Sequence, residues 1–216
     1  MQQPRRRLSP DDRRSELLAL GAEAFGQRPY DDVRIDEIAE QAGVSRALMY
    51  HYFPDKRAFF VAVVRAEGDR LFEATSMPAE LGQTLFGQLR AGVLAYVDYH
   101  ESHPYGAWAA HIGVGRSDPA VLGIDDQDND RQADRIMSAI TDAVPDGLDS
   151  KVERDLRITV YGWLAFTLEL CRQRIMDPSI DAGHVGDACA HALLDAIARV
   201  PGIPAGLAAA VVSERR

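Results

Sequence analysis

Apolar residues recur along the chain at the spacing of amphipathic helices, and no stretch alternates apolar and polar residues convincingly, as a half-buried strand does. The first helix is expected after Ser9-Pro10-Asp11-Asp12, where Ser9 can cap it and the next three residues suit its first turn. Its apolar stripe consists of Leu17, Leu18, Gly21, Ala24 and Phe25. The pattern therefore predicts an all-α fold.

The segment after this helix predicts two short helices joined by a tight turn. Apolar residues from Ile35 to Ala42 follow the i, i+3, i+4, i+7 spacing of one helix face, and Gly43 is expected to end that helix in the left-handed conformation. Ser45 can cap the second helix, which should run to about Tyr52. Such a pair forms a helix-turn-helix, whose second helix can enter the major groove of DNA.

Two domains are expected, linked by a long fourth helix. Pro54 should open this helix, and Ser76-Met77-Pro78 is the best candidate boundary behind it. Residues 1–57, with the linking helix 54–76, then form an N-terminal three-helix DNA-binding domain. Residues 77–216 form a C-terminal helical domain.

The C-terminal part is predicted to be helical as well. The expected helices lie near 80–102, 105–114, 126–144, 150–176 and 182–199, with a short last helix after Pro201. The stretch 115–130 is rich in glycine and aspartate and is predicted to be a loop.

The second short helix has an inward and an outward face. Met49 and Phe53 are four residues apart and should point to the core. The other positions point outward: Arg46, Ala47, Leu48, Tyr50 and His51. Arginine and tyrosine can bind phosphate oxygens, arginine can pair with guanine, and alanine or leucine can touch a thymine methyl. The outward face is therefore predicted to contact DNA.

This segment resembles the DNA-binding domain of the tetracycline-repressor (TetR) family. The match is I-A-x-x-A-G-V-S from Ile38 to Ser45, then Tyr50, Phe53 and Lys56 at the family spacing, and it covers about the first 60–70 residues. The resemblance implies an all-α homodimer whose C-terminal domain binds a small molecule that relieves repression. By position it implies DNA contacts from Ser45, Arg46, Ala47, Leu48, Tyr50, His51 and Lys56, and Arg34 departs from the family pattern but adds a cation that can bind a phosphate. Arg34 replaces the usual capping Ser or Thr by a cation.

Charge is divided unevenly along the 216 residues, which carry 24 Lys and Arg against 33 Asp and Glu, a net charge of −9. Residues 1–57 hold ten basic and ten acidic residues, so the whole excess of negative charge lies in the remainder. The N-terminal quarter thus lacks the excess that repels DNA. Its Arg5–Arg7 cluster is either an arm along the phosphates or a solvated tail.

The cysteine usage and the apolar runs favour a cytoplasmic protein with no membrane partner. Only Cys171 and Cys189 occur, without a C-x-x-C pair, and no apolar segment follows the basic N-terminus as in a signal peptide. The longest apolar stretch, 158–171, is too short to span a bilayer and carries Glu169.

Aromatic residues of the second domain suit the wall of an effector pocket, although core packing explains any single one equally well. The candidate ligand-binding residues are Tyr105, Trp108, His111, Trp163, Phe166 and Glu169. The main expectation for Glu169 is a pair with Arg172. The family resemblance assigns the dimer interface to helices 150–176 and 182–199, the second of which carries an Ala/Leu face. That face comprises Ala188, Ala192, Leu193 and Ile197.

No metal, cofactor or catalytic site is expected. His100 and His103 share a helix face, but Pro104 follows at once and no acidic residue has ligand spacing. The acidic run 126–130 lacks the glycine and glutamate that a calcium loop requires. The catalytic motifs G-x-S-x-G and H-E-x-x-H and a Gly-rich phosphate loop are absent from the sequence.

The favoured function is a repressor that a small-molecule effector releases from a palindromic double-stranded operator. The alternative is a helix-turn-helix protein that acts without a ligand or as an activator, and an all-α enzyme is the third class considered.

Overall fold

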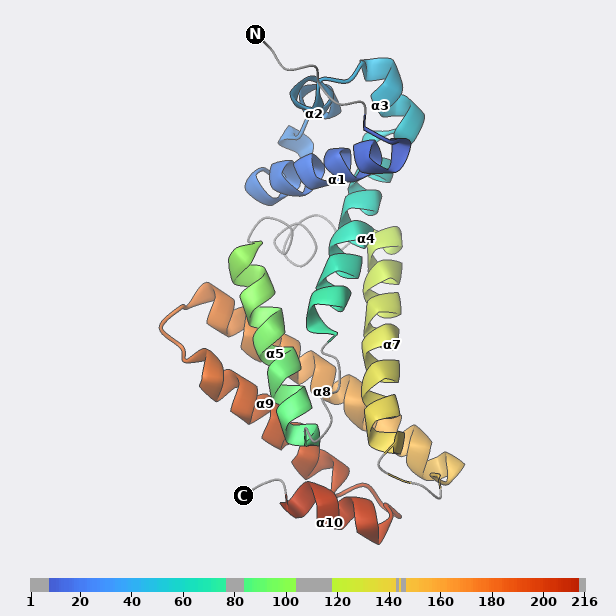
Figure 1. Ribbon diagram of the computed structural model, residues 1–216, viewed down its shortest axis with the longest axis vertical. Helices are drawn as coiled ribbons and strands as arrows, with labels where there is room; N and C mark the ends of the chain where they lie inside the picture. Colours follow the sequence, from blue (N-terminus) through green and yellow to red (C-terminus); the bar gives the residue numbers. More distant parts are fainter. Residues whose placement is uncertain (1–7, 77–83, 104–117, 143, 145–146, 214–216) are drawn as a thin grey trace. The chain divides into compact units, whose positions relative to one another are not determined.

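The computed structural model describes residues 8–76, 84–103, 118–142, 144 and 147–213, and every secondary-structure element in these ranges is helical (Figure 1). The all-α prediction is confirmed. Contacts divide the chain into two compact units, residues 1–70 with 103–124 and residues 71–102 with 125–216. The expected helix 105–114 lies outside the described residues.

The first unit contains the predicted helix-turn-helix. Its helices are α1 (Pro10–Gln27), the short 3-10 helix η1 (Tyr30–Asp32), α2 (Ile35–Ala42), α3 (Arg46–Tyr52), the first part of α4 (Lys56–Thr75) and the start of α7 (Pro119–Asp142). Ser9 caps α1 as predicted, because its hydroxyl accepts the Asp12 N–H at 3.1 Å and the Asp12 carboxylate accepts the Ser9 N–H at 3.4 Å. This reciprocal pair is a capping box with aspartate at its third position.

The core of the first unit joins α1, α2, α3 and α4. Leu17 of α1, Ile38 of α2, Met49 of α3 and Phe59 of α4 are at most 1% exposed. Gly21 of α1 lies against α4 so closely that a Cβ atom there would come within 2.5 Å of the Phe59 ring. The packing of α1 on α4 therefore depends on a residue without a side chain.

The turn between α2 and α3 has the predicted geometry. Gly43 has φ 65° and ψ 36°, the left-handed conformation, and its N–H donates to the Glu40 carbonyl at 2.9 Å. The Ser45 hydroxyl accepts the Leu48 N–H at 3.1 Å and so caps α3. Two local signals in the sequence thus fix where α2 ends and α3 begins.

The linking helix α4 begins at Lys56, two residues later than predicted, and Asp55 is the residue that caps it. The Asp55 carboxylate accepts the Ala58 N–H at 2.7 Å, and its carbonyl accepts the Phe59 N–H at 3.0 Å. Pro54 precedes the cap and does not itself open the helix.

The prediction of a loop over 115–130 is wrong, because α7 (Pro119–Asp142) begins inside it. Asp118 caps this helix by accepting the Ala120 N–H at 2.8 Å, and Pro119 occupies its first position. Val121 and Ile124 are buried in the core of the first unit. The aspartates that suggested a loop are the solvated side of an amphipathic helix, whose apolar positions the composition concealed.

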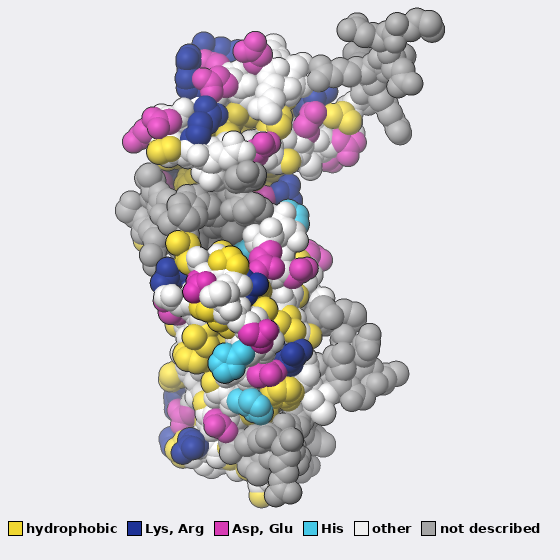
Figure 2. Space-filling view, turned by 90° about the vertical axis from the view of Figure 1, so that its left-hand side faces the viewer, with side chains coloured by type: hydrophobic (Ala, Val, Ile, Leu, Met, Phe, Trp, Pro, Cys, Tyr) yellow, Lys and Arg dark blue, Asp and Glu magenta, His cyan; other side chains and the backbone are white. Residues whose placement is uncertain are grey.

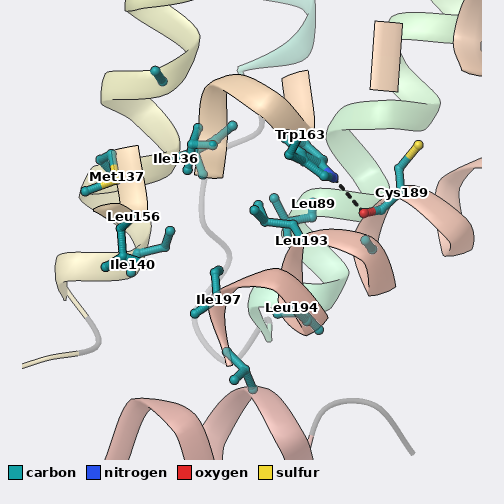
Figure 3. Close-up of a cluster of buried hydrophobic side chains, with 14 of the residues drawn as sticks. Leu89, Ile136, Met137, Ile140, Leu156, Trp163, Cys189, Leu193, Leu194 and Ile197 are labelled. Atoms are coloured by element: carbon teal, nitrogen blue, oxygen red, sulfur yellow. Dashed lines mark hydrogen bonds between the residues drawn. The ribbon is translucent and has the colours of Figure 1, made fainter. Parts of the chain in front are cut away.

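The second unit is a helical bundle around a second core (Figure 3). It contains α5 (Leu85–Ser102), the rest of α7, α8 (Ser150–Met176), α9 (Ala182–Ile197) and α10 (Ala205–Ser213). Helices α8 and α10 lie where the sequence predicts them, and α9 ends two residues earlier than residue 199. In the core the Trp163 indole N–H donates to the Cys189 carbonyl at 2.7 Å, which joins α8 to α9.

Arginines of α7 hold the end of α4 within this second unit. Arg135 donates to the Phe72 carbonyl at 3.3 Å and to the hydroxyls of Thr75 and Ser76 at 3.2 and 2.6 Å. The guanidinium carbons of Arg131 and Arg135 lie 4.1 and 4.8 Å from the centroid of the Phe72 ring. Arg135 thus donates to the Phe72 carbonyl in the last turn of α4 and to two hydroxyls beside it.

Candidate nucleic-acid interface

Helix α3 divides into the predicted inward and outward faces. Met49 is fully buried, and Phe53, directly after the helix, is 2% exposed. Leu48 and Tyr50 are 37% and 38% exposed, and the remaining predicted contact residues of the helix are exposed as well: Arg46, Ala47 and His51. A short helix therefore presents five side chains to solvent while its buried residues hold it to the domain.

Arg46, the first residue of α3, contacts both the neighbouring helix α2 and a residue of its own helix. Its Nε lies 3.0 Å from Oδ1 of Asp36 in α2, and its guanidinium carbon lies 5.7 Å from the centroid of the Tyr50 ring, one turn further along α3. The Arg46 side chain is nevertheless 70% exposed. The arginine is thus placed over the outward face with most of its surface in solvent.

Arg34 and Lys56 lie at the edges of the helix-turn-helix. Arg34 precedes α2 without capping it and lies 3.8 Å from Glu37, whose pKa is held below its usual range first by the hydrogen bond from Arg28. Lys56 Nζ donates to the Asp31 carbonyl at 3.0 Å and lies 4.6 Å from the centroid of the Tyr30 ring. An ammonium group has three donors, so this bond leaves Lys56 able to bind a phosphate.

The electrostatic character of this domain is mixed. Figure 2 shows basic and acidic side chains next to each other over the N-terminal helices. The first turn of α2 carries Asp36 and Glu37, and three arginines lie within 4 Å of these two carboxylates: Arg28, Arg34 and Arg46. Electrostatic attraction of this domain to an anionic partner is therefore weakened by the domain's own acids.

The candidate effector residues are not brought together in the described part of the chain. Trp163 is buried in the core, whereas Phe166 is 44% exposed. Glu169 is exposed and pairs with Arg172 at 2.7 and 2.8 Å, as predicted, and also accepts from Gln173 at 2.7 Å. The other three candidates lie outside the described residues: Tyr105, Trp108 and His111.

The cysteines have no catalytic environment. Both are free and fully buried, and burial raises the pKa of Cys171 to about 12 and that of Cys189 in the same direction. A neutral, buried thiol is a poor nucleophile and a poor metal ligand. In the described part of the chain, no group of three or more His, Cys, Asp or Glu side chains is placed to hold a metal ion.

Asp36 is the residue of this interface that sequence analysis missed. Its place in the first turn of α2 is already explained by the helix dipole, which favours acids there. Only the turn between the two helices brings its carboxylate to Arg46, ten positions away, and no spacing rule along one helix predicts that contact.

The geometry defines a helix-turn-helix domain on an all-helical chain, the class of fold that places its second helix in the DNA major groove. Residues 17–63 match the family model described as bacterial regulatory proteins, tetR family. The chain thus carries a TetR-family helix-turn-helix domain, and the resemblance found in the sequence is confirmed.

Curated relatives with this similarity are named as regulators of transcription. The chain is 35% identical over 101 residues to the HTH-type transcriptional activator FasR of Mycolicibacterium smegmatis, an alignment that covers 46% of each protein. It is 30% identical over 103 residues to the regulator EthR of the same species, over 45% of this chain and 46% of that protein. The chain therefore matches about half the length of these relatives, whose names agree with the expectation of a protein that is not an enzyme.

The fold extends the similarity along nearly the whole chain. A tetR-family regulator from Streptomyces coelicolor superposes with a TM-score of 0.75 over 95% of this chain and 89% of that one, at 23% identity. A putative regulator from Pseudomonas aeruginosa gives a TM-score of 0.70 over 97% of both chains, at 18% identity.

In the described part of the chain, no helix combines the length and the apolar character that a membrane span requires.

Proposed function

We propose that this chain is a DNA-binding regulator of transcription that acts in the cytoplasm and contacts operator DNA through α3. The observation that carries the proposal is the exposed Arg46–Tyr50 face above a fully buried Met49, in a segment that matches the tetR family. An exposed arginine and tyrosine at the start of such a helix can contact base edges and phosphates. Arg34 and Lys56 add cations for the backbone on either side.

A homodimer supports this function, since two recognition helices about 34–36 Å apart fit successive major grooves of a palindromic operator. The outward side of α8 carries apolar or small exposed residues at helical spacing: Ile158, Gly162, Ala165 and Phe166. A Cβ atom at Gly162 would meet nothing within 4 Å, so a second chain could approach closely there. We place the dimer contact on this stripe together with the half-exposed Ala188 and Ala192 of α9.

The Ala/Leu face predicted for α9 needs a correction. Leu193 and Ile197 are fully buried in the chain's own core, as Figure 3 shows, and are therefore not available to a partner. They lie on the side of the helix that packs within the bundle, which an apolar pattern alone cannot distinguish from an interface.

The proposal keeps the predicted division into residues 1–57, with linking helix 54–76, and 77–216, and it assigns the effector site to the latter range, of which residues 103–124 group by contacts with the first unit. The aromatic candidates for it include Tyr105, Trp108 and His111. Repression relieved by a small molecule is the favoured mode of action. Activation is the second candidate, and the name of FasR as a transcriptional activator favours it.

Titration of DNA duplexes tests the proposal. A duplex that the protein selects from a random-sequence pool should bind more weakly to Arg46→Ala and to Tyr50→Phe. The loss for Tyr50→Phe should be about 0.5–3 kcal/mol and uniform across sequences if its hydroxyl binds a phosphate. Arg154→Ala, an exposed arginine of α8, is the control and should bind as the wild type does. Wild-type affinity of both α3 variants would refute the assignment of α3 as the DNA-binding helix.

Transcription from a template that carries the selected site separates the two modes. A repressor lowers the transcript yield and an activator raises it. A small molecule that reverses either effect identifies an effector.

A further inference from the structure

We infer that Asp36 positions Arg46 for contact with a base, so that α2 and α3 together set the sequence preference of the domain. The inference rests on the proposed function, since it assumes that α3 contacts DNA. Its observation is the 3.0 Å approach of Arg46 Nε to Asp36 Oδ1, combined with the placement of the guanidinium over the Tyr50 ring.

The two contacts restrain one arginine from two directions. Asp36 engages the Nε side of the guanidinium, and the Tyr50 ring lies beneath its carbon. Within the described residues, the guanidinium has no further ion pair or hydrogen bond. Its terminal amino groups are therefore left for a partner, while part of the arginine's rotamer freedom is already lost before DNA binds.

The contact between Asp36 and Arg46 can become stronger when DNA is bound. Its Oδ1 is buried and accepts no hydrogen bond, because the short approach of Arg46 lacks hydrogen-bond alignment. A buried acceptor without a donor is unfavourable, so a small rotation of the guanidinium that aligns Nε–H with Oδ1 is stabilising. Such a rotation fixes the plane of the guanidinium and hence the direction of its amino groups.

The carboxylate also selects the kind of group that Arg46 can contact. A phosphate beside Arg46 would stand near the negative charge of Asp36 and be repelled by it. The neutral edge of a guanine offers the O6 and N7 acceptors, which suit two parallel donors of an arginine. The geometry thus points to a guanine in each half-site as the group that Arg46 contacts.

A simpler role for Asp36 is to stabilise the first turn of α2, where any acid is favourable. Glu37 shares that role, because it occupies the next position of the same turn and pairs with Arg28 and not with Arg46. Asp36→Asn and Glu37→Gln therefore remove one negative charge each from the same helix turn, and only the first removes the charge that pairs with Arg46. They form a matched pair of variants.

The test is a titration of the duplex that the wild type selects and of variants of it with each base pair changed in turn. The wild type should discriminate at one guanine per half-site by about 5- to 150-fold, the range of a good bidentate contact. Asp36→Asn should reduce that ratio to less than about threefold and leave the ratios at other positions unchanged. Glu37→Gln should keep the wild-type ratios at every position. Asp36→Glu, which restores the charge, should recover part of the lost discrimination.

Arg46→Ala completes the set of variants, since it should abolish the preference for the same guanine. Adding Asp36→Asn to Arg46→Ala should then have no further effect on that preference. The inference is overturned if Asp36→Asn keeps the wild-type ratio at that guanine, or if it weakens all duplexes equally. It is also overturned if Arg46→Ala leaves every base preference intact. A wild type that selects no sequence refutes the proposed function as well, so the two failures differ. Melting curves of Asp36→Asn and Asp36→Glu show whether either variant is unfolded.

Discussion

Replacing Gly21 by alanine should destabilise the DNA-binding domain, although the same change usually stabilises a helix. Alanine gains about 1 kcal/mol over glycine in a helix interior. At this position the new methyl group would come within 2.5 Å of Phe59 Cζ and 2.7 Å of Val63 Cγ2, and both residues are fully buried. Overpacking of a dense core costs about 1–3 kcal/mol. Two contacts of this kind place the clash in the upper part of that range, so the net loss should be about 1–2 kcal/mol.

Gly123 of α7 is the matched control. A Cβ atom there meets nothing within 4 Å, so Gly123→Ala should stabilise the protein by about 0.5–1 kcal/mol. For a chain of this size 1 kcal/mol corresponds to about 2–4 °C in Tm, so the melting temperature should fall by about 2–8 °C for Gly21→Ala and rise for Gly123→Ala. Calorimetry or circular dichroism at one protein concentration measures both.

A double-mutant cycle identifies the clash itself. Phe59→Leu removes the ring carbon nearest to Gly21, so Gly21→Ala should cost clearly less in that background than in the wild type. A Gly21→Ala protein that melts at or above the wild-type temperature would show that α1 and α4 are not packed as closely as described.

Three further outcomes are expected. Ser45→Ala removes the cap of α3 and should lower the free energy of unfolding by about 1 kcal/mol, measured by urea denaturation, whereas an unchanged midpoint speaks against the cap. Phe166→Glu should shift a dimer towards monomer in sedimentation, and Leu122→Glu, at an equally exposed position, should not; a monomeric wild type at micromolar concentration contradicts the interface. Asp118 accepts two hydrogen bonds from Arg57, which together with the N-terminus of α7 lower the pKa of the Asp118 carboxyl from its ordinary value of 3.8. The ionised carboxylate therefore stabilises the fold above pH 3.8, and this stabilisation is lost as the pH falls through the lowered pKa. Arg57→Ala should therefore raise the Asp118 pKa measured by NMR, and an unchanged value would exclude the pair in solution.

The helix-turn-helix could be predicted from the sequence because local chemistry determines it. Ser9, Gly43 and Ser45 each act through hydrogen bonds or backbone angles within a few residues of themselves, so their effect is visible without the fold. The division of α3 into buried and exposed faces follows in the same way from the period of the helix.

The features that escaped prediction depend on distant contacts. Asp36 contacts Arg46 only because the turn between α2 and α3 brings the two residues together. Leu193 is apolar because it packs in the core of its own helical bundle, and not because it contacts a partner chain. The start of α7 was concealed by aspartates, although Asp118 and Pro119 form a good cap and first position. At this position the two local signals are more informative than the overall composition.

The burial of both cysteines makes the chain suitable for site-specific labelling. Because the thiols of Cys171 and Cys189 are enclosed in the core and held neutral by a raised pKa, they should react slowly with maleimides or nitroxide reagents. A cysteine introduced at the exposed Ala47 of α3 would then be the reactive one, without removal of the native pair. In a dimer, two nitroxides at this position would report the spacing of the recognition helices, with and without a small molecule, in solution.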